Sequence, residues 1–171
     1  MPQKVINWKK LKKINLEKKI CLLGIGNFDR SDDYVGGAVL DELQNYSFPK
    51  NIVILNSGPV PEAFTGVIKK ERPDYLIIID AANMGESPGT IRVFTEKDID
   101  DAFMITPHKT SMKMYLKYLR HFLKHLKAFF IGIEPQSLSY LEEMTPKVKE
   151  SVTFLSKLLA DFLRKNVDES E

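Results

Sequence analysis

Four uninterrupted apolar runs constrain the fold of this chain more than any other feature. They cover residues 20–25, 51–55, 75–79 and 128–133. A run without polar alternation predicts a strand that is buried on both faces, as in a parallel sheet. A fifth segment, Thr90–Phe94, alternates and follows Pro88-Gly89, so it predicts a half-exposed strand at the edge of the sheet.

Helical patterns fill the intervals between these strands. The expected helices cover residues 36–43, 62–70, 111–126 and 145–165. Strands that alternate with helices predict βαβ units with helices on both faces of the sheet. The expected fold class is therefore α/β, a three-layer α/β/α sandwich around a mostly parallel sheet with one antiparallel edge strand.

The length of 171 residues fits one domain, which we expect over residues 19–166. A basic arm, residues 1–18, precedes this domain, and a polar tail, residues 167–171, follows it. Residues 1–20 contain seven lysines and one glutamate, so the rest of the chain is mildly acidic. We expect the arm either to pack on the domain with its lysines in water or to contact an acidic partner.

Apolar residues recur every third position in the arm, at Val5, Trp8, Leu11 and Ile14. This spacing predicts a short amphipathic helix.

Composition excludes several classes of protein. The net charge of +2 gives no argument for nucleic-acid binding, and a single cysteine, Cys21, allows no internal disulfide. The sequence contains no apolar run long enough for a transmembrane helix, and no apolar segment of a signal peptide follows the first lysines. We expect a cytoplasmic protein that neither binds nucleic acid nor inserts into a membrane.

Acidic residues lie where two of the predicted strands end. Asp32 and Asp33 precede the first helix, and Asp80 directly follows the apolar run 75–79. Open α/β sheets bind ligands beyond the carboxyl ends of their strands, so these acids are candidate site residues. Two structural alternatives remain open: helix capping by Asp32 and Asp33, and a hydrogen-bonded, loop-holding role for Asp80.

A histidine in a loop, His108, completes a candidate set of metal ligands with Asp33 and Asp80. Mixed oxygen and nitrogen ligation suits zinc, nickel or a related ion, although a loop histidine can equally be a surface residue. The segment Gly24-Ile-Gly-Asn-Phe-Asp29 lacks the third glycine of a dinucleotide-binding loop. Cys21 lies inside a predicted strand, which is typical of a core residue rather than a nucleophile.

Five ordered motifs together resemble one known family. They are Gly24-Ile-Gly-Asn27 followed by Asp33 and Gly36, then Ser57–Glu62, Arg72–Gly85 with Pro88-Gly89, Thr106-Pro-His108, and Gly132–Gln136 with Met144-Thr145. Over about residues 19–160 the chain resembles the nickel–iron hydrogenase maturation endopeptidases. The last motif is similar to the HycI-type branch, which processes formate-hydrogenlyase-type hydrogenases.

This resemblance implies a fold, an activity and a site. The family fold is a twisted, mostly parallel five-stranded sheet between helices. The family's metal-binding positions correspond to Asp33, Asp80 and His108, and the two aspartates are the implied catalytic residues. The implied substrate-binding or loop-shaping residues are Gly26, Asn27, Glu62 and Gly85. No residue is implied to bind a resident cofactor.

The implied partner is the precursor of the hydrogenase large subunit. Family members remove its C-terminal peptide after nickel insertion, and the nickel presented by the substrate serves as the recognition element. A divalent metal is expected to be able to occupy the same site in the isolated protein, which we expect to be a monomer. Two features depart from the family pattern: Tyr34 stands where glycine often follows the acidic pair, and the arm extends beyond the usual start.

Two mechanisms and two other functions stay open at this stage. The metal either polarises the scissile carbonyl or a water while one carboxylate moves a proton, or it serves recognition only and the aspartates act on water as a dyad. A non-catalytic chaperone for the nickel-loaded large subunit is the main alternative. A metal-dependent hydrolase of a small substrate is another, with only Arg30 and Lys109 near the site to anchor the substrate.

Overall fold

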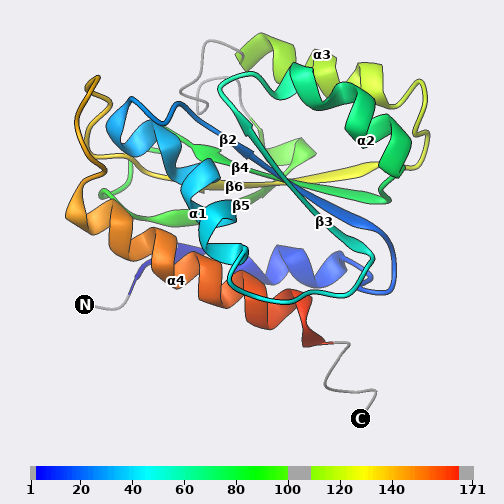
Figure 1. Cartoon of the computed structure of the whole chain (residues 1–171), viewed down its shortest axis with the longest axis horizontal. Coiled ribbons are helices and arrows are strands. Elements are labelled where there is room, and N and C mark those ends of the chain that lie inside the picture. The colour runs from blue at the N-terminus through cyan, green and yellow to red at the C-terminus, as the bar shows by residue number, and fades with distance from the viewer. Residues whose placement is uncertain (1–2, 100–108, 166–171) are drawn as a thin grey trace.

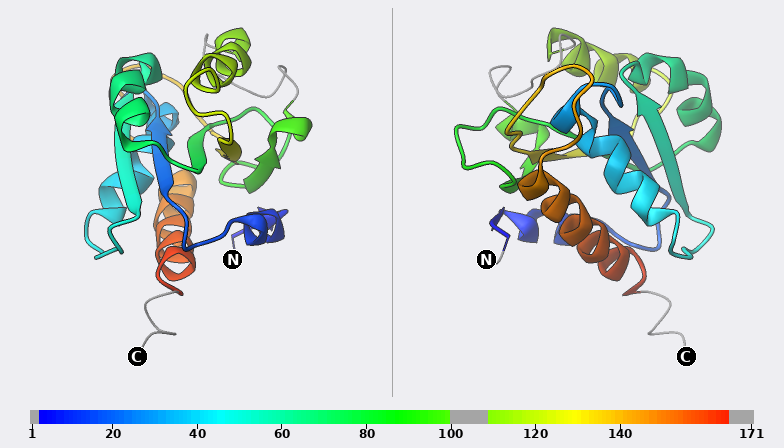
Figure 2. Two further views of the ribbon diagram at one scale, coloured as in Figure 1. Left: turned by 90° about the vertical axis from the view of Figure 1, so that its right-hand side faces the viewer. Right: turned by 60° about the vertical axis from the view of Figure 1, so that its left-hand side comes forward.

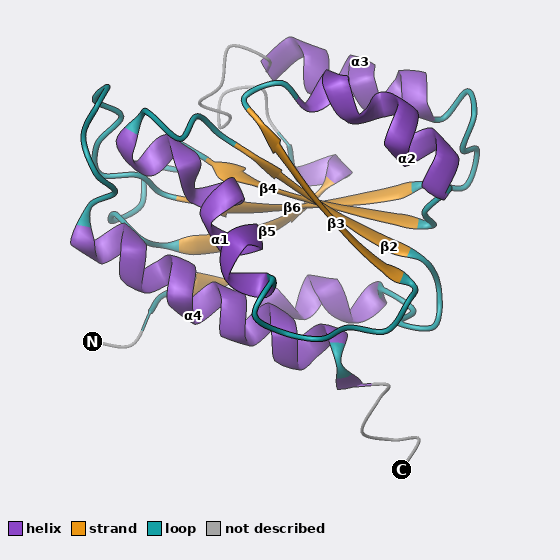
Figure 3. Ribbon diagram, viewed as in Figure 1, coloured by secondary structure: helices purple, strands orange, loops and turns teal. Residues whose placement is uncertain are grey.

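The computed structural model describes residues 3–99 and 109–165. Its strands are β1 (Val5–Ile6), β2 (Ile20–Ile25), β3 (Ile52–Gly58), β4 (Tyr75–Ala81), β5 (Ile91–Thr95) and β6 (Lys127–Ile133). They form one sheet in the order β1-β5-β6-β4-β2-β3 (Figures 1 and 3). All neighbours are parallel except β5 and β6, so the predicted mostly parallel sheet is confirmed.

The α-helices are α1 (Val35–Leu43), α2 (Thr65–Glu71), α3 (Lys109–Leu119) and α4 (Pro146–Leu163). Short 3-10 helices are η1 (Trp8–Lys13), η2 (Ser31–Tyr34), η3 (Pro61–Phe64) and η4 (Glu96–Asp98). Helices α1 and α4 cover one face of the sheet, and α2 and α3 cover the other (Figure 1). The predicted three-layer sandwich is confirmed.

The centre of the sheet explains why the strand sequences are continuously apolar. All seven residues of β4 are buried. Ile77 and Ile79 belong to the core shared with α1 and α4, whereas Leu76 and Ile78 belong to the core shared with α2 and α3. Side chains on both faces of β4 are therefore buried in a hydrophobic core, so no position of the strand alternates with a polar, solvent-facing residue as in a half-exposed strand.

The prediction that the strand at 90–94 lies at the sheet edge is wrong. Strand β1 pairs in parallel with the outer side of β5, and so adds a sixth strand from the basic arm (Figure 2). The amphipathic spacing in the arm corresponds to the six-residue 3-10 helix η1, whose Leu11 is fully buried in the α4 core. Trp8 packs edge-on against Phe162 of α4, with 6.1 Å between ring centroids.

Two expected helices have different limits in the structure. The pattern at 62–70 divides into η3 and α2, and the helix expected over 111–126 ends at Leu119. Leu123 and Leu126 are nevertheless buried in the α3 core. Hydrophobic periodicity indicates which side chains are buried and not where a helix ends. The apolar pattern therefore continues beyond the last residue of α3. No helix in the described residues is long and apolar enough to cross a membrane.

The chain connections create a switch point between β2 and β4. From β2 the chain passes through α1 on one face to β3, and it then returns through α2 on the opposite face to β4, on the other side of β2. Ligands of doubly wound sheets bind in the crevice that such a reversal opens at the carboxyl ends of the strands. Gly24 lies opposite Ile79, so Ile25 and Asp80 lie at this same edge.

Helix α1 approaches the backbone of both switch-point strands at Gly36. A Cβ atom at this position would lie 2.2 Å from the carbonyl oxygen of Ile79 and 2.4 Å from that of Ile25. Only a residue without a side chain allows this approach, which places the loop before α1 directly over the ends of β2 and β4.

We therefore expect Gly36→Ala to lower the free energy of unfolding by at least about 2 kcal/mol, because backbone carbonyls cannot move aside as a flexible side chain would. Urea denaturation of the purified variant measures this loss. Gly66→Ala in α2 is the matched control, since nothing lies within 4 Å of its added Cβ. The control should be neutral or more stable by about 0.5–1 kcal/mol. Equal stability of the two variants would contradict the role of the contact.

Candidate functional site

The loop after β2 folds back on itself and carries Asp33 to the end of that strand. Gly26 has φ 147°, and a Cβ atom there would lie 2.0 Å from the carbonyl oxygen of Asp33. The backbone N–H of Asn27 donates a hydrogen bond of 3.0 Å to Asp33 Oδ2. Gly26 and Asn27 therefore shape the loop that orients this carboxylate.

Asp33 and Asp80 are both buried, and each has one oxygen atom without a hydrogen bond. Asp33 is 4% exposed and Asp80 is 2% exposed. Asp80 is the second-last residue of β4, and its Oδ1 accepts a 2.8 Å hydrogen bond from the N–H of Ala81. Asp33 Oδ1 and Asp80 Oδ2 have no partner among the described residues.

The two carboxylates influence each other electrostatically. Burial raises the pKa of Asp80 well above its ordinary value, and the negative charge of Asp33 raises it further. Buried carboxylate oxygens are normally satisfied by hydrogen bonds or ions, so these two oxygens are candidates for binding a proton or a cation. The donor set is chemically suited to a divalent cation that accepts oxygen ligands.

The third predicted ligand, His108, lies outside the described residues. Among residues 3–99 and 109–165, no group of three His, Cys, Asp or Glu side chains is placed to hold a metal ion. Of the other predicted residues, Glu62 is exposed in η3, which follows β3 at the same edge of the sheet. Gly85 has φ 70° in the loop after β4.

Asp32 has a role that the sequence reasoning missed. Its side chain is fully buried and accepts hydrogen bonds from the backbone N–H groups of Gln136, Ser137 and Thr145, at 2.8, 2.9 and 2.8 Å. The Thr145 hydroxyl also donates to this carboxylate. No side-chain hydrogen bond caps η2 or α1, so the capping alternative for Asp32 and Asp33 is wrong. Asp32 instead holds the loop of residues 134–145.

Glu134 is a second buried acid to which the sequence assigned no role. It is 7% exposed, and its Oε2 accepts a 2.6 Å hydrogen bond from the N–H of Met84. This contact holds the loop after β4, which includes Gly85. The Gly132–Gln136 motif marked the segment, but nothing in the motif by itself indicates which backbone group the acid binds.

Tyr34 and Cys21 are structural in the described part of the chain. The Tyr34 hydroxyl donates to Asp41 at 2.7 Å and accepts from Asn56 at 2.9 Å. Its ring lies over Gly37, where a Cβ atom would meet it at 2.2 Å. Cys21 is fully buried, and burial raises its pKa to about 12, so the thiol is a core group and not a nucleophile.

Comparisons of this chain with known proteins agree on one family. The family model of HycI, the hydrogenase maturation protease, matches residues 38–161. The Hydrogenase 3 maturation protease of Escherichia coli K12 is 32% identical over 132 residues, covering 77% of this chain and 82% of the relative.

Solved structures of similar proteins share the fold. The crystal structure of the NiFe hydrogenase maturation protease HycI from Thermococcus kodakarensis matches with a TM-score of 0.73 and 25% identity, over 86% of this chain and 94% of that one. The hydrogenase maturating endopeptidase HybD from E. coli matches with a TM-score of 0.73 and 26% identity, over 86% and 93% of the two chains.

We expect Asp32→Ala to release the loop of residues 134–145, because the N–H groups of Gln136, Ser137 and Thr145 lose their acceptor. The loss of stability should be about 2–4 kcal/mol. Hydrogen exchange at the amides of Gln136, Ser137 and Thr145 measures the release directly. Asp161→Ala, on the exposed side of α4, is the control and should leave these amides protected. Unchanged protection in Asp32→Ala would contradict the anchoring role.

The raised pKa of Asp80 predicts how stability depends on pH. In metal-free buffer the folded protein holds the Asp80 proton more tightly than the unfolded chain, so ionisation costs stability as pH rises from 3.8 through the folded pKa. Asp80→Asn should remove this cost and exceed the wild type in stability more at pH 7 than at pH 4. Urea denaturation at both pH values checks the difference. A variant less stable than the wild type at pH 7 would contradict the assignment.

Proposed function

The chain belongs to the hydrogenase maturation protease family, a family of peptide hydrolases, and on that premise we propose the reaction that it performs. It removes the C-terminal peptide of a hydrogenase large-subunit precursor, and it recognises the precursor by the nickel already inserted there. The observation that carries this proposal is the pair of buried carboxylates, Asp33 and Asp80, each with one unpartnered oxygen.

The proposal explains why an enzyme would keep two like charges together at the switch point. The unpartnered oxygens of Asp33 and Asp80 form an incomplete ligand set with the oxygen chemistry that a partly coordinated divalent cation accepts. His108, on the segment before α3, is the proposed third ligand. A cation on the substrate satisfies both oxygens, so a precursor without metal lacks the group that makes binding favourable.

Asp80 is the better candidate for moving the proton. Its Oδ2 accepts no hydrogen bond within the described residues, so this oxygen is available to accept a proton. We propose that Asp80 accepts a proton from the attacking water and passes it to the leaving amine, while Asp33 acts as a ligand. Asn27 holds Asp33 in orientation through its backbone N–H.

The same ligand set is proposed to take up a divalent metal in the isolated protein. Asp80 would then release its proton, because a cation between the carboxylates favours their charged forms. This uptake would be competitive with the nickel-loaded precursor, since both use the same oxygens.

The experiment that tests the proposal is cleavage of a large-subunit precursor with and without nickel, followed by mass spectrometry. We expect cleavage only of the nickel-loaded precursor. Asp33→Asn, Asp80→Asn and His108→Ala should each lower kcat/KM by at least about a thousandfold, as removal of a catalytic or metal-binding group does. Asp161→Asn, which lies on α4 away from the site, should cleave like the wild type.

Other outcomes assign other functions. Binding of the nickel-loaded precursor without any cut would identify a chaperone. Equal cleavage of precursors with and without nickel would remove the metal from recognition and leave an aspartic-type protease. Normal processing by His108→Ala would show that the ligand set lacks this histidine.

A further inference from the structure

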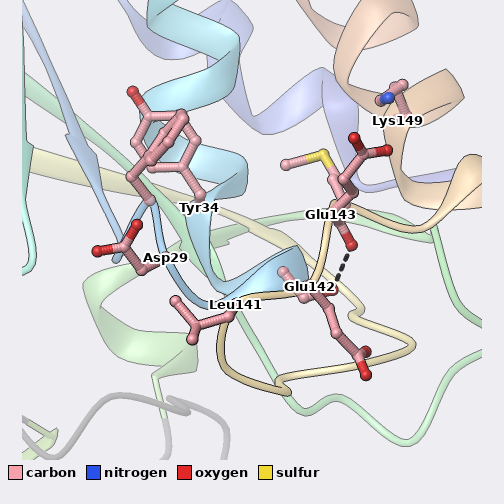
Figure 4. Close-up of a pocket in the computed structure, with 9 residues that line it drawn as sticks. Asp29, Tyr34, Leu141, Glu142, Glu143 and Lys149 are labelled. Carbon is pink, nitrogen blue, oxygen red and sulfur yellow. Dashed lines mark hydrogen bonds between the residues drawn. The ribbon is translucent and has the colours of Figure 1, made fainter.

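A cavity of about 440 Å³ opens between the loop after β2 and the loop before α4 (Figure 4). One wall contains Phe28, Asp29 and Tyr34, and the other contains Leu141, Glu142 and Glu143. The volume lies within the range of ligand-binding pockets. Ser31 of the wall and Asp33 belong to the same short helix, η2, so the cavity adjoins the segment that carries Asp33 of the proposed site.

The two loops are held to each other by hydrogen bonds rather than by apolar packing. The Asp29 carbonyl accepts a hydrogen bond of 2.7 Å from the N–H of Leu141. The Ser31 hydroxyl donates a hydrogen bond of 2.9 Å to the Glu143 carbonyl. Arg30 Nε donates 2.9 Å to the Leu138 carbonyl. The cavity is therefore formed before any ligand arrives, which lowers the entropic cost of binding.

Leu141 combines a strained backbone conformation with an apolar side chain that is exposed to solvent. Its φ is 60°, a left-handed conformation that costs a leucine energy, and its side chain is 88% exposed. Phe28, which also lines the cavity, is 75% exposed, and its ring packs edge-to-face with Tyr34 at 5.1 Å between centroids. Strained residues that present apolar groups to solvent are typical of ligand clamps.

The charges around these apolar groups have mainly one sign. Asp29, Glu142 and Glu143 line the cavity, and Lys149 is the one base among the described residues that line it. Arg30, beside the cavity, is already used by the Leu138 carbonyl and by the ring of Tyr140, 5.2 Å from the guanidinium carbon. A ligand here should therefore combine an apolar side chain with positive charge.

We propose that this cavity binds a peptide segment in which an apolar side chain is flanked by basic residues. Resting on the proposed function, this segment is the part of the precursor near the scissile bond. The apolar side chain lies between Leu141 and Phe28, and the basic residues lie beside Asp29, Glu142 and Glu143. Selectivity for the precursor then depends on its peptide sequence as well as on its metal.

The test uses short fluorescein-labelled peptides with the centres Lys-Leu-Lys, Lys-Ser-Lys and Glu-Leu-Glu, measured by fluorescence anisotropy at low salt. We expect the wild-type protein to prefer the Lys-Leu-Lys peptide. Leu141→Asn should weaken this binding about tenfold, as the loss of one apolar contact does. Asparagine tolerates the left-handed backbone and Leu141 is exposed, so this variant keeps the loop intact.

A double variant, Glu142→Gln with Glu143→Gln, should lose the preference for the basic over the acidic peptide. Phe154→Gln and Glu17→Gln, which lie outside the cavity, are the controls and should bind like the wild type. With the nickel-loaded precursor, Leu141→Asn should raise KM about tenfold and leave kcat unchanged.

Equal peptide binding by wild type and Leu141→Asn, or equal binding of the basic and acidic peptides, would overturn the proposal. So would an unchanged KM. Peptide binding needs neither nickel nor cleavage, so it separates the two proposals. Selective peptide binding by a protein that cuts no precursor would support the cavity and contradict the proposed function.

Discussion

The close approach of helix α1 to the ends of β2 and β4 is the contact on which the rest of the site depends. No side chain separates Gly36 from the carbonyl oxygens of Ile25 and Ile79. Asp33, three residues earlier, is therefore held over the end of β4, the strand that contains Asp80. Both carboxylates are buried, and burial is the main cause of the raised pKa of Asp80.

The adjacent residues Asp32 and Asp33 have different roles in the loop after β2. Asp32 has all of its acceptor capacity used by backbone and hydroxyl donors of residues 136–145, whereas Asp33 keeps one oxygen without a hydrogen bond. One acid stabilises the structure, and its neighbour is the proposed ligand of the substrate's cation. A buried carboxylate pair that lacks a counter-ion costs stability, and such costs are characteristic of functional sites.

The sequence predicted the strands better than the helix limits or the edges of the sheet. Strands β2, β4 and β6 are buried on both faces, which requires continuous apolar runs. These runs could be recognised directly in the sequence. Periodicity extended the third helix to residue 126 because Leu123 and Leu126 are buried outside the helix. The edge assignment of β5 failed because its partner β1 has only two residues, too few for any strand pattern. His108 stays a prediction.

The sequence by itself determined which segments become strands and which family the motifs resemble, because burial and backbone geometry impose residue types locally. It also placed Asp33 and Asp80 at strand ends, where parallel strands bring distant residues to one edge. Only the tertiary structure decided which acid of the Asp32–Asp33 pair holds a loop. That choice rests on hydrogen bonds to residues as far as 113 positions away. Partners so distant leave no local signal, since the fold alone brings the donors of Thr145 to Asp32.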